Sequence, residues 1–165
     1  MSGQGAGGAP VQVAVCGPSA CTDRQRRDAR EVGRLLAERG AVVLCGGYGG
    51  VMAAAAEGAR AADGITVGVL SGADRAGAGS DLSVVLPTGL GEARNSVLVR
   101  SADAVIVVGG SWGTLSELAH AMRRGDVPVV QLGGWRILDE DGRPLGGVLD
   151  AGGPEDAVAL TGLWP

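Results

Sequence analysis

The stretch AVIVVGGSWGT, from Ala104 to Thr114, decides the fold. Its first five residues, Ala104 to Val108, form an unbroken apolar run rich in β-branched side chains, which is typical of a strand buried on both faces. Glycines follow at once, and a helical apolar pattern runs from Leu115 to about Arg124. A buried strand that turns through glycine into a helix predicts one unit of a parallel sheet.

The same order of strand, turn and helix recurs on both sides of this stretch. The apolar patterns predict further strands at 11–16, 42–45, 65–70, 82–86 and 127–132, and helices at 23–40, 51–62, 91–101 and from 154 onward. The first helix is expected to start at a capping box, Thr22 with Gln25. Right-handed crossovers place helices on both faces, so we expect a three-layer, Rossmann-like α/β fold with a parallel sheet.

The composition suits one domain. The chain has 165 residues, of which 45% are hydrophobic and 19% charged, enough to bury a single core. We expect a flexible leader at 1–10 and a single Rossmann-like nucleotide- or phosphate-binding domain at 11–165, with a hairpin turn at Asp141-Gly142. No apolar run reaches the roughly 18 to 20 residues of a membrane span, and the leader lacks signal-peptide features, so a cytoplasmic location is expected.

Charge and residue usage exclude several classes of function. A net charge of -4 argues against nucleic-acid and membrane partners. The sequence contains no Lys, which excludes a pyridoxal phosphate Schiff base and a P-loop lysine. The three cysteines, Cys16, Cys21 and Cys45, form no C-x-x-C, so neither a disulfide framework nor a metal site is predicted.

Two glycine clusters, 46–50 and 109–113, lie between a predicted strand and a predicted helix. Backbone N–H groups and the helix dipole at such turns attract anions, so the pair predicts a pocket for a small phosphorylated ligand, most simply a nucleotide. The dinucleotide fingerprint GxGxxG is missing after the first strand, which argues against an NAD dehydrogenase. The predicted phosphate- and nucleotide-binding residues are Gly17, Ser19, Gly46, Gly47, Gly49, Gly50, Met52, Asn95, Gly109, Gly110, Ser111, Trp112, Gly113 and Thr114.

Glu117 and Arg94 are the candidate catalytic residues. Thr114-Leu115-Ser116-Glu117 fits a capping box, in which Glu117 would only bond back to the Thr114 N–H. Alternatively, a carboxylate one turn from a phosphate-binding helix end could activate water or stabilise a cationic sugar-like transition state. Arg94, in the first turn of a helix, opposes the helix dipole and suggests a nearby anion, unless it is solvated or paired with Glu92.

Two further residues each have a structural and a functional interpretation. His120 forms an E-x-x-H pair with Glu117, but without a second such motif it is most simply a half-buried helix residue. Trp112 could stack on a base or shield the glycine loop from water, and we favour shielding.

Three motifs, GGYGGVM at 46–52, EARN at 92–95 and GGSWGTLSE at 109–117, resemble those of the LONELY GUY-like family. The pattern looks closer to a shorter branch that includes molybdenum-cofactor carrier proteins. Two departures matter: Val108 and one extra loop residue replace the family's PGGxGT, and Asn95 replaces the usual lysine. The resemblance also implies a homodimer or homotetramer.

The resemblance implies two alternative functions. Characterised members are nucleoside 5′-monophosphate phosphoribohydrolases, in which the roles of the catalytic arginine and glutamate would fall to Arg94 and Glu117 here, while Gly110, Gly113 and Thr114 would hold the phosphate. The alternative is a non-catalytic carrier or sensor for a nucleotide or a molybdopterin-type ligand. No cofactor is expected to be required for hydrolysis.

Overall fold

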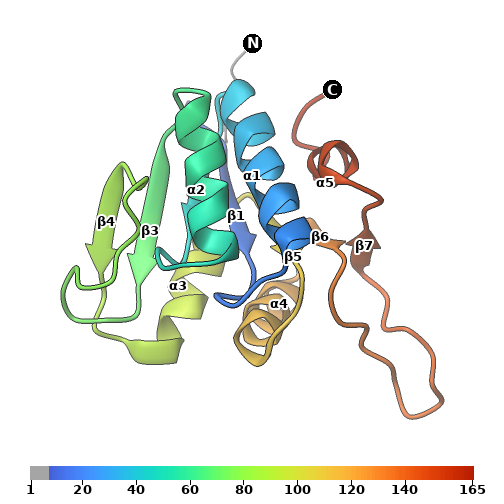
Figure 1. Cartoon of the computed structure of the whole chain (residues 1–165). Helices are drawn as coiled ribbons and strands as arrows, with labels where there is room; N and C mark the ends of the chain where they lie inside the picture. The colour runs from blue at the N-terminus through green and yellow to red at the C-terminus, as the bar shows by residue number, and fades with distance from the viewer. Residues whose placement is uncertain (1–7) are drawn as a thin grey trace.

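Seven parallel strands form one sheet in the computed structural model, which describes residues 8–165 (Figure 1). Most of the predicted leader, residues 1–7, lies outside the described part. The strands stand in the order β4-β3-β2-β1-β5-β6-β7, and every neighbouring pair is parallel. Their bounds are β1 Gln12–Cys16, β2 Val42–Cys45, β3 Thr66–Leu70, β4 Val84–Pro87, β5 Ala104–Val108, β6 Val129–Leu132 and β7 Val148–Asp150.

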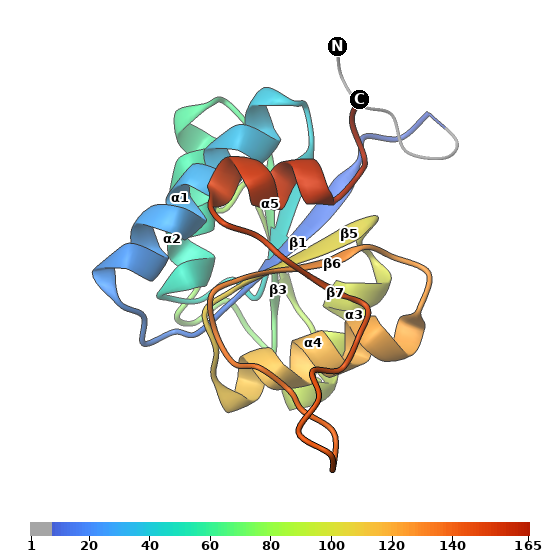
Figure 2. The same cartoon turned by 90° about the vertical axis from the view of Figure 1, so that its right-hand side faces the viewer.

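Helices cover both faces of this sheet. Figure 2 shows α1, α2 and α5 on one face and α3 and α4 on the other. Their bounds are α1 Asp23–Glu38, α2 Val51–Ala61, α3 Arg94–Arg100, α4 Trp112–Arg124 and α5 Pro154–Leu160, and a 3₁₀ turn at Gly91–Ala93 leads into α3. The predicted three-layer, Rossmann-like α/β fold is therefore confirmed.

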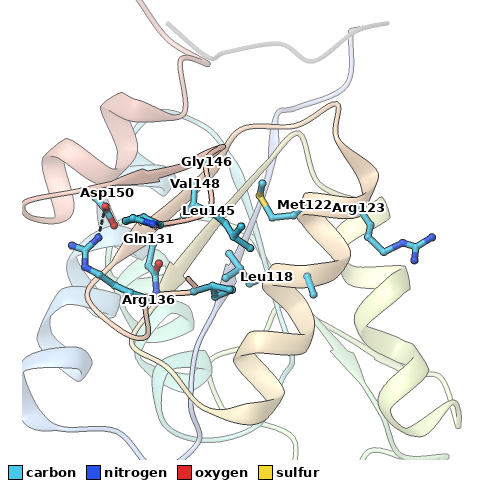
Figure 3. A pocket seen from close by; sticks show the side chains of 12 residues that line it. Leu118, Met122, Arg123, Gln131, Arg136, Leu145, Gly146, Val148 and Asp150 are labelled. Atoms are coloured by element: carbon cyan, nitrogen blue, oxygen red, sulfur yellow. Dashed lines mark hydrogen bonds and ion pairs between the residues drawn. The ribbon is translucent and has the colours of Figure 1, made fainter. Parts of the chain in front are cut away.

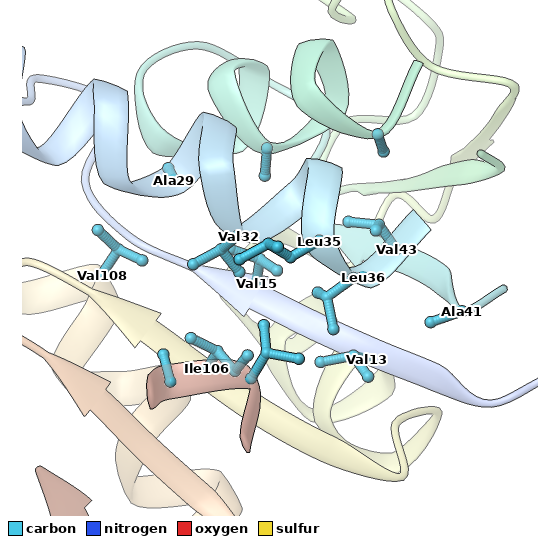
Figure 4. Close-up of a cluster of buried hydrophobic side chains, with 14 of the residues drawn as sticks. Val13, Val15, Ala29, Val32, Leu35, Leu36, Ala41, Val43, Ile106 and Val108 are labelled. Carbon is cyan, nitrogen blue, oxygen red and sulfur yellow. The ribbon is translucent and has the colours of Figure 1, made fainter. Parts of the chain in front are cut away.

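Alternating strand residues divide the core between the two faces. On the face of α1 and α2, Val13, Val15 and Ile106 pack against Val32 and Leu36 of α1 (Figure 4). Their sequence neighbours point the other way and join a second cluster with buried residues of α3 and α4, namely Ala14, Cys16, Val105, Val107, Leu98, Val99, Leu118 and Ala121. Small branched side chains thus fill both layers without any phenylalanine.

Glycine allows α1 and α2 to pack with their backbones in contact. A Cβ atom at Gly33 would collide with the carbonyl oxygen of Ala55, and one at Gly58 would collide with that of Arg30. The close approach explains why an alanine-rich helix follows β2, since larger side chains would force the helices apart.

Capping and turn residues correctly predicted where most helices and strands begin or end. The predicted capping box forms, with Thr22 Oγ1 accepting from Gln25 N at 3.1 Å and Gln25 Oε1 accepting from Thr22 N at 3.0 Å. Asp141-Gly142 lies in a tight turn closed by a bond from Gly142 N to Asp139 O, although only an isolated bridge flanks it. Strand β4 is shifted to Val84–Pro87 from the predicted 82–86. Between residues 8 and 165, every helix is too short or too polar to cross a membrane.

The strand order reverses between β1 and β5. Strands β2 to β4 extend the sheet on one side of this pair, and β6 and β7 extend it on the other. Ligands of open parallel sheets bind beyond the carboxyl ends of the strands at such a switch point. The segments that follow β1 and β5, at 17–19 and 109–111, are therefore placed to frame a site.

Candidate functional site

A cavity of about 280 Å³ opens at the carboxyl edge of the sheet, at this switch point. Its walls come from the segments after β1, β3 and β5 and from the beginnings of α2, α3 and α4. Nine of the sequence-predicted residues line it: Gly17, Ser19, Met52, Arg94, Asn95, Ser111, Gly113, Thr114 and Glu117. Pro18, Ser71, Gly91 and Glu92 complete the lining.

The N-terminus of α4 faces this cavity. Ser111 is the N-cap, and its Oγ accepts from Thr114 N at 3.2 Å and lies 2.9 Å from Thr114 Oγ1. Within residues 8–165, the N–H groups of Trp112 and Gly113 donate to no other backbone or side-chain group. Two free donors and two hydroxyl groups at the positive end of a helix dipole form a binding site for an anion.

This geometry corrects the predicted capping box at Thr114 and Glu117. The helix starts at Trp112 instead of Leu115, because Ser111 is a capping residue three positions earlier. Thr114 is therefore already helical, and its N–H is satisfied by Ser111. Glu117 lies in the second turn, where it has no capping role.

Glu117 lines the cavity and is buried, with 7% of its surface exposed. Burial raises the pKa of its carboxyl group to about 7, against the opposing effects of the Arg94 charge and a hydrogen bond from the Cys16 thiol. Burial, followed by the nearby Glu117 carboxylate, also raises the pKa of Cys16 well above its ordinary value. Near neutral pH, Glu117 can therefore accept or release a proton, whereas Cys16 stays a neutral thiol.

Arg94 turns away from solvent and spans the ends of two strands. Its Nη1 donates to Gly46 O at 2.7 Å and to Val69 O, and its Nε donates to Asn95 Oδ1 at 3.1 Å. The alternative of a solvated or Glu92-paired arginine does not hold, because these backbone carbonyls at the strand ends hold the guanidinium inside the site. Nη2 donates to no described residue and remains available to a ligand.

Asn95, which stands where the resemblance would place a lysine, is a neutral polar residue. It is buried, accepts from Arg94 and donates from Nδ2 to Ser116 Oγ at 3.4 Å. These contacts link α3 to α4 and fix the orientation of Arg94 towards the cavity.

The first glycine cluster serves the fold more than the cavity. Gly46, Gly47, Gly49 and Gly50 do not line the cavity. Gly47 and Gly50 have positive φ values of 83° and 65°, and the first N–H of α2 donates to Pro18 O. This loop packs against the segment after β1, so its amides do not face the cavity, although Gly46 supplies a carbonyl to Arg94.

The second cluster is braced by a tryptophan from the segment after β6. A Cβ atom at Gly110 would lie 2.6 Å from Trp135 Cδ1, and Gly109 has a φ of 74°. Trp112 packs edge-on against Trp135, with ring centroids 4.9 Å apart, but is itself 78% exposed. Like Gly109 and Gly110, Trp112 does not line the cavity, and its role in shielding the loop stays a prediction.

One candidate residue lies outside the cavity, and one residue that lines the cavity was not predicted from the sequence. His120 is half-buried in a small cleft between α3 and α4, away from the cavity. Among residues 8–165, no three His, Cys, Asp or Glu side chains come close enough to hold a metal ion. Ser71 directly follows β3, so the rule that ligands bind at strand carboxyl ends could have identified it.

The fold and the site define a Rossmann-like α/β protein with a glycine turn and a helix N-terminus at a small polar cavity. The chain belongs to the SLOG cluster4 family, whose sequence pattern matches residues 10–158.

Similar proteins include members of two functional groups. The chain is 36% identical over 132 residues to the cytokinin riboside 5′-monophosphate phosphoribohydrolase of Mycobacterium tuberculosis, covering 75% of this chain and 71% of that protein. The molybdenum cofactor binding protein of Rippkaea orientalis superposes with a TM-score of 0.81 at 32% identity, covering 91% of this chain and 94% of that one. The molybdenum cofactor carrier protein of Chlamydomonas reinhardtii gives a TM-score of 0.75 at 30% identity, covering 90% and 94%.

These similarities confirm the predicted relationship to LONELY GUY-like proteins and molybdenum-cofactor carriers. They support a nucleotide-related or carrier function. The homodimer or homotetramer stays a prediction.

Proposed function

We propose that this protein binds a nucleoside 5′-monophosphate in the cavity at the switch point and hydrolyses its N-glycosidic bond. The observation that carries the proposal is the buried carboxyl group of Glu117, whose pKa is about 7, in the same cavity as the free N–H groups of α4. The relative from Mycobacterium tuberculosis, named for this reaction on a cytokinin substrate, supports it.

The phosphate would bind at the start of α4. Trp112 N and Gly113 N would donate to it, with the hydroxyl groups of Ser111 and Thr114 beside them. The dipole of the 13-residue helix and the charge of Arg94 would compensate the phosphate charge. Gly113 suits this approach, because a Cβ atom there would meet nothing closer than Ser111 Oγ at 3.9 Å and would occupy ligand space.

Glu117 would then act on the ribose. Water attacks C1′ and the C1′–N bond breaks, so that the electron pair of that bond and a proton leave with the base and ribose 5-phosphate remains. The Glu117 carboxylate would accept the proton of the attacking water, which balances the proton that the base takes up from solvent, and would stabilise the positive charge that develops on the sugar. Arg94 Nη2 would orient the substrate, because its other donors are held by the protein.

The test is release of free base from a panel of nucleoside 5′-monophosphates. We expect turnover by the wild-type protein, loss of at least about a hundredfold in Glu117→Gln, and wild-type rates in Glu155→Gln, the same change on the distant helix α5. The rate should rise with pH through about 7, as Glu117 loses its proton. An inert wild-type protein, or a Glu117→Gln variant as fast as wild type, would overturn the proposal.

A second candidate is a carrier that binds a molybdopterin-type ligand without changing it. The observation that favours it is the similarity, over nine-tenths of both chains, to two proteins named for binding or carrying molybdenum cofactor. The same N–H groups would hold the terminal phosphate of the pterin. Native mass spectrometry of freshly purified protein separates the candidates: an intact co-purified pterin with no nucleotide turnover identifies a carrier, and turnover identifies the hydrolase.

A further inference from the structure

A second, larger cavity of about 560 Å³ lies on the other side of α4, outside the site described above. Its walls come from α4, β6, β7 and the segment 136–146 that joins the two strands. Figure 3 shows Leu118, Met122, Leu145 and Val148 around this space. The volume falls within the roughly 300 to 1,000 Å³ of small-molecule sites, and aliphatic side chains dominate the lining.

One buried polar side chain faces this otherwise apolar cavity. Gln131 lines it with only 8% of its surface exposed, and its Nε2 donates to Trp135 O at 2.7 Å. Its Oε1 accepts from no residue in the described range 8–165. Because Oε1 is accessible to solvent and has no donor from the described residues, Gln131 can accept one hydrogen bond from a ligand.

Of the three charged residues that line the cavity, two form an ion pair and the third points outward. Arg136 and Asp150 form an ion pair at 2.7 Å across one end, drawn as a dashed line in Figure 3. The Arg123 side chain points away from the space in the same view. With the nearby charges paired or directed outward, a neutral ligand fits better than an ionic one, since an ion would lose its hydration without gaining a partner.

We propose that this cavity is a second ligand site, for a small, neutral and mostly apolar molecule, such as an aromatic ring system, with one hydrogen-bond donor for Gln131 Oε1. Indole has this chemistry, and benzothiophene has nearly the same shape without the donor. Trp135 reports occupancy, because its carbonyl is held by Gln131 and its ring lies against Trp112. Trp164, at the C-terminal end beyond α5, packs into the cluster on the opposite face of the sheet and serves as an internal reference.

The experiment is a titration of ¹⁵N-labelled protein with indole, followed at the side-chain N–H resonances of its three tryptophans. We expect a saturable shift at Trp135 and none at Trp164. Ala119→Trp, an exposed position of α4 that lines the cavity, should abolish the shift by filling the space, whereas Ala61→Trp at an exposed position of α2 should retain it.

The hydrogen bond has a separate readout. Gln131→Met should weaken indole binding about tenfold and leave benzothiophene binding unchanged, because only indole has a donor to lose. Comparing the two ligands within one variant removes any effect of Gln131 on the neighbouring loop. Three results would overturn the proposal: no saturable shift at Trp135, the same shift in Ala119→Trp, or a shift that follows protein concentration without ligand, which would mean that a second copy fills the cavity.

Discussion

Burial of Glu117 should make the stability of this protein depend on pH with an unusual sign. The pKa of its carboxyl group rises from an ordinary value of 4.5 to about 7 in the folded chain, with burial as the main cause. One pKa unit corresponds to about 1.4 kcal/mol, so the folded state is destabilised by about 3 kcal/mol once the group is ionised in both states.

The sign follows from proton counting. Between pH 4.5 and about 7, the folded chain holds a proton on Glu117 that the unfolded chain has lost, so unfolding releases a proton and stability falls as pH rises. The penalty is absent below pH 4.5 and complete above about pH 7. Most buried carboxyl groups with a cationic partner behave in the opposite way, because the partner lowers their pKa.

The perturbation is Glu117→Gln, and the assay is urea unfolding of both proteins at pH 5 and pH 8. The variant should gain relative to wild type by about 2 to 3 kcal/mol between these conditions, because glutamine does not titrate and all other groups are shared. Glu155→Gln, at an exposed position of α5, provides the matched control and should show no such gain. Parallel pH profiles for wild type and Glu117→Gln would refute the assignment of a perturbed carboxyl group.

Three further predictions concern a helix cap, a contact between two helices and the glycines that line the cavity. Ser111→Ala should lower the free energy of unfolding by about 1 kcal/mol in chemical denaturation, because it removes the N-cap of α4. Gly58→Ala should lower the melting temperature by several degrees despite the better helix propensity of alanine, because its Cβ meets the backbone of α1. Gly113→Ala should leave the melting temperature within about one degree of wild type but weaken phosphate binding measured by calorimetry. Gly17→Ala, by contrast, should lower the free energy of unfolding by about 1 to 3 kcal/mol, because its Cβ would lie 2.5 Å from Val51 Cγ1.

The sheet was predictable because its strands carry long buried runs with little ambiguity. Ala104–Val108 is buried at every position, and its pattern alone indicated a buried strand of a parallel sheet. The edge strand β7, at Val148–Asp150, was missed because three residues with one half-buried position give no periodicity. Strand β4 also lies at an edge, with three of its four residues exposed, and its bounds were displaced for the same reason.

The two capping-box motifs show that a local sequence pattern does not always predict the structure that forms. Thr22 with Gln25 and Thr114 with Glu117 match the same motif, yet only the first forms a box. Ser111 caps α4 three residues before Thr114, so Glu117 lies in the second turn, where it is buried beside Cys16, whereas Gln25 lies at an exposed helix start. Sequence reasoning therefore identified the residue but could not choose between its two roles.

Arg94 illustrates the same limit for charge. Its position against the helix dipole suggested a nearby anion, which stays a prediction, whereas the structure shows the carbonyl groups of Gly46 and Val69 as partners of the cation. Those carbonyls belong to strand ends far away in sequence, which no local pattern reports. The glycine at 46 was thus singled out for an amide when its carbonyl is the group that contacts the site.

Helix α4 joins the two cavities through the geometry of its own turns. Thr114 and Glu117 face the polar cavity, while Leu118 and Met122 face the apolar one, because residues three or four apart share a side of a helix. Trp135 links the same two regions at the start of the helix, since its ring contacts Gly110 and its carbonyl accepts from Gln131. A ligand that moved Trp135 would therefore act on the loop that leads into the free N–H groups, which makes the placement of the second cavity relevant to the first.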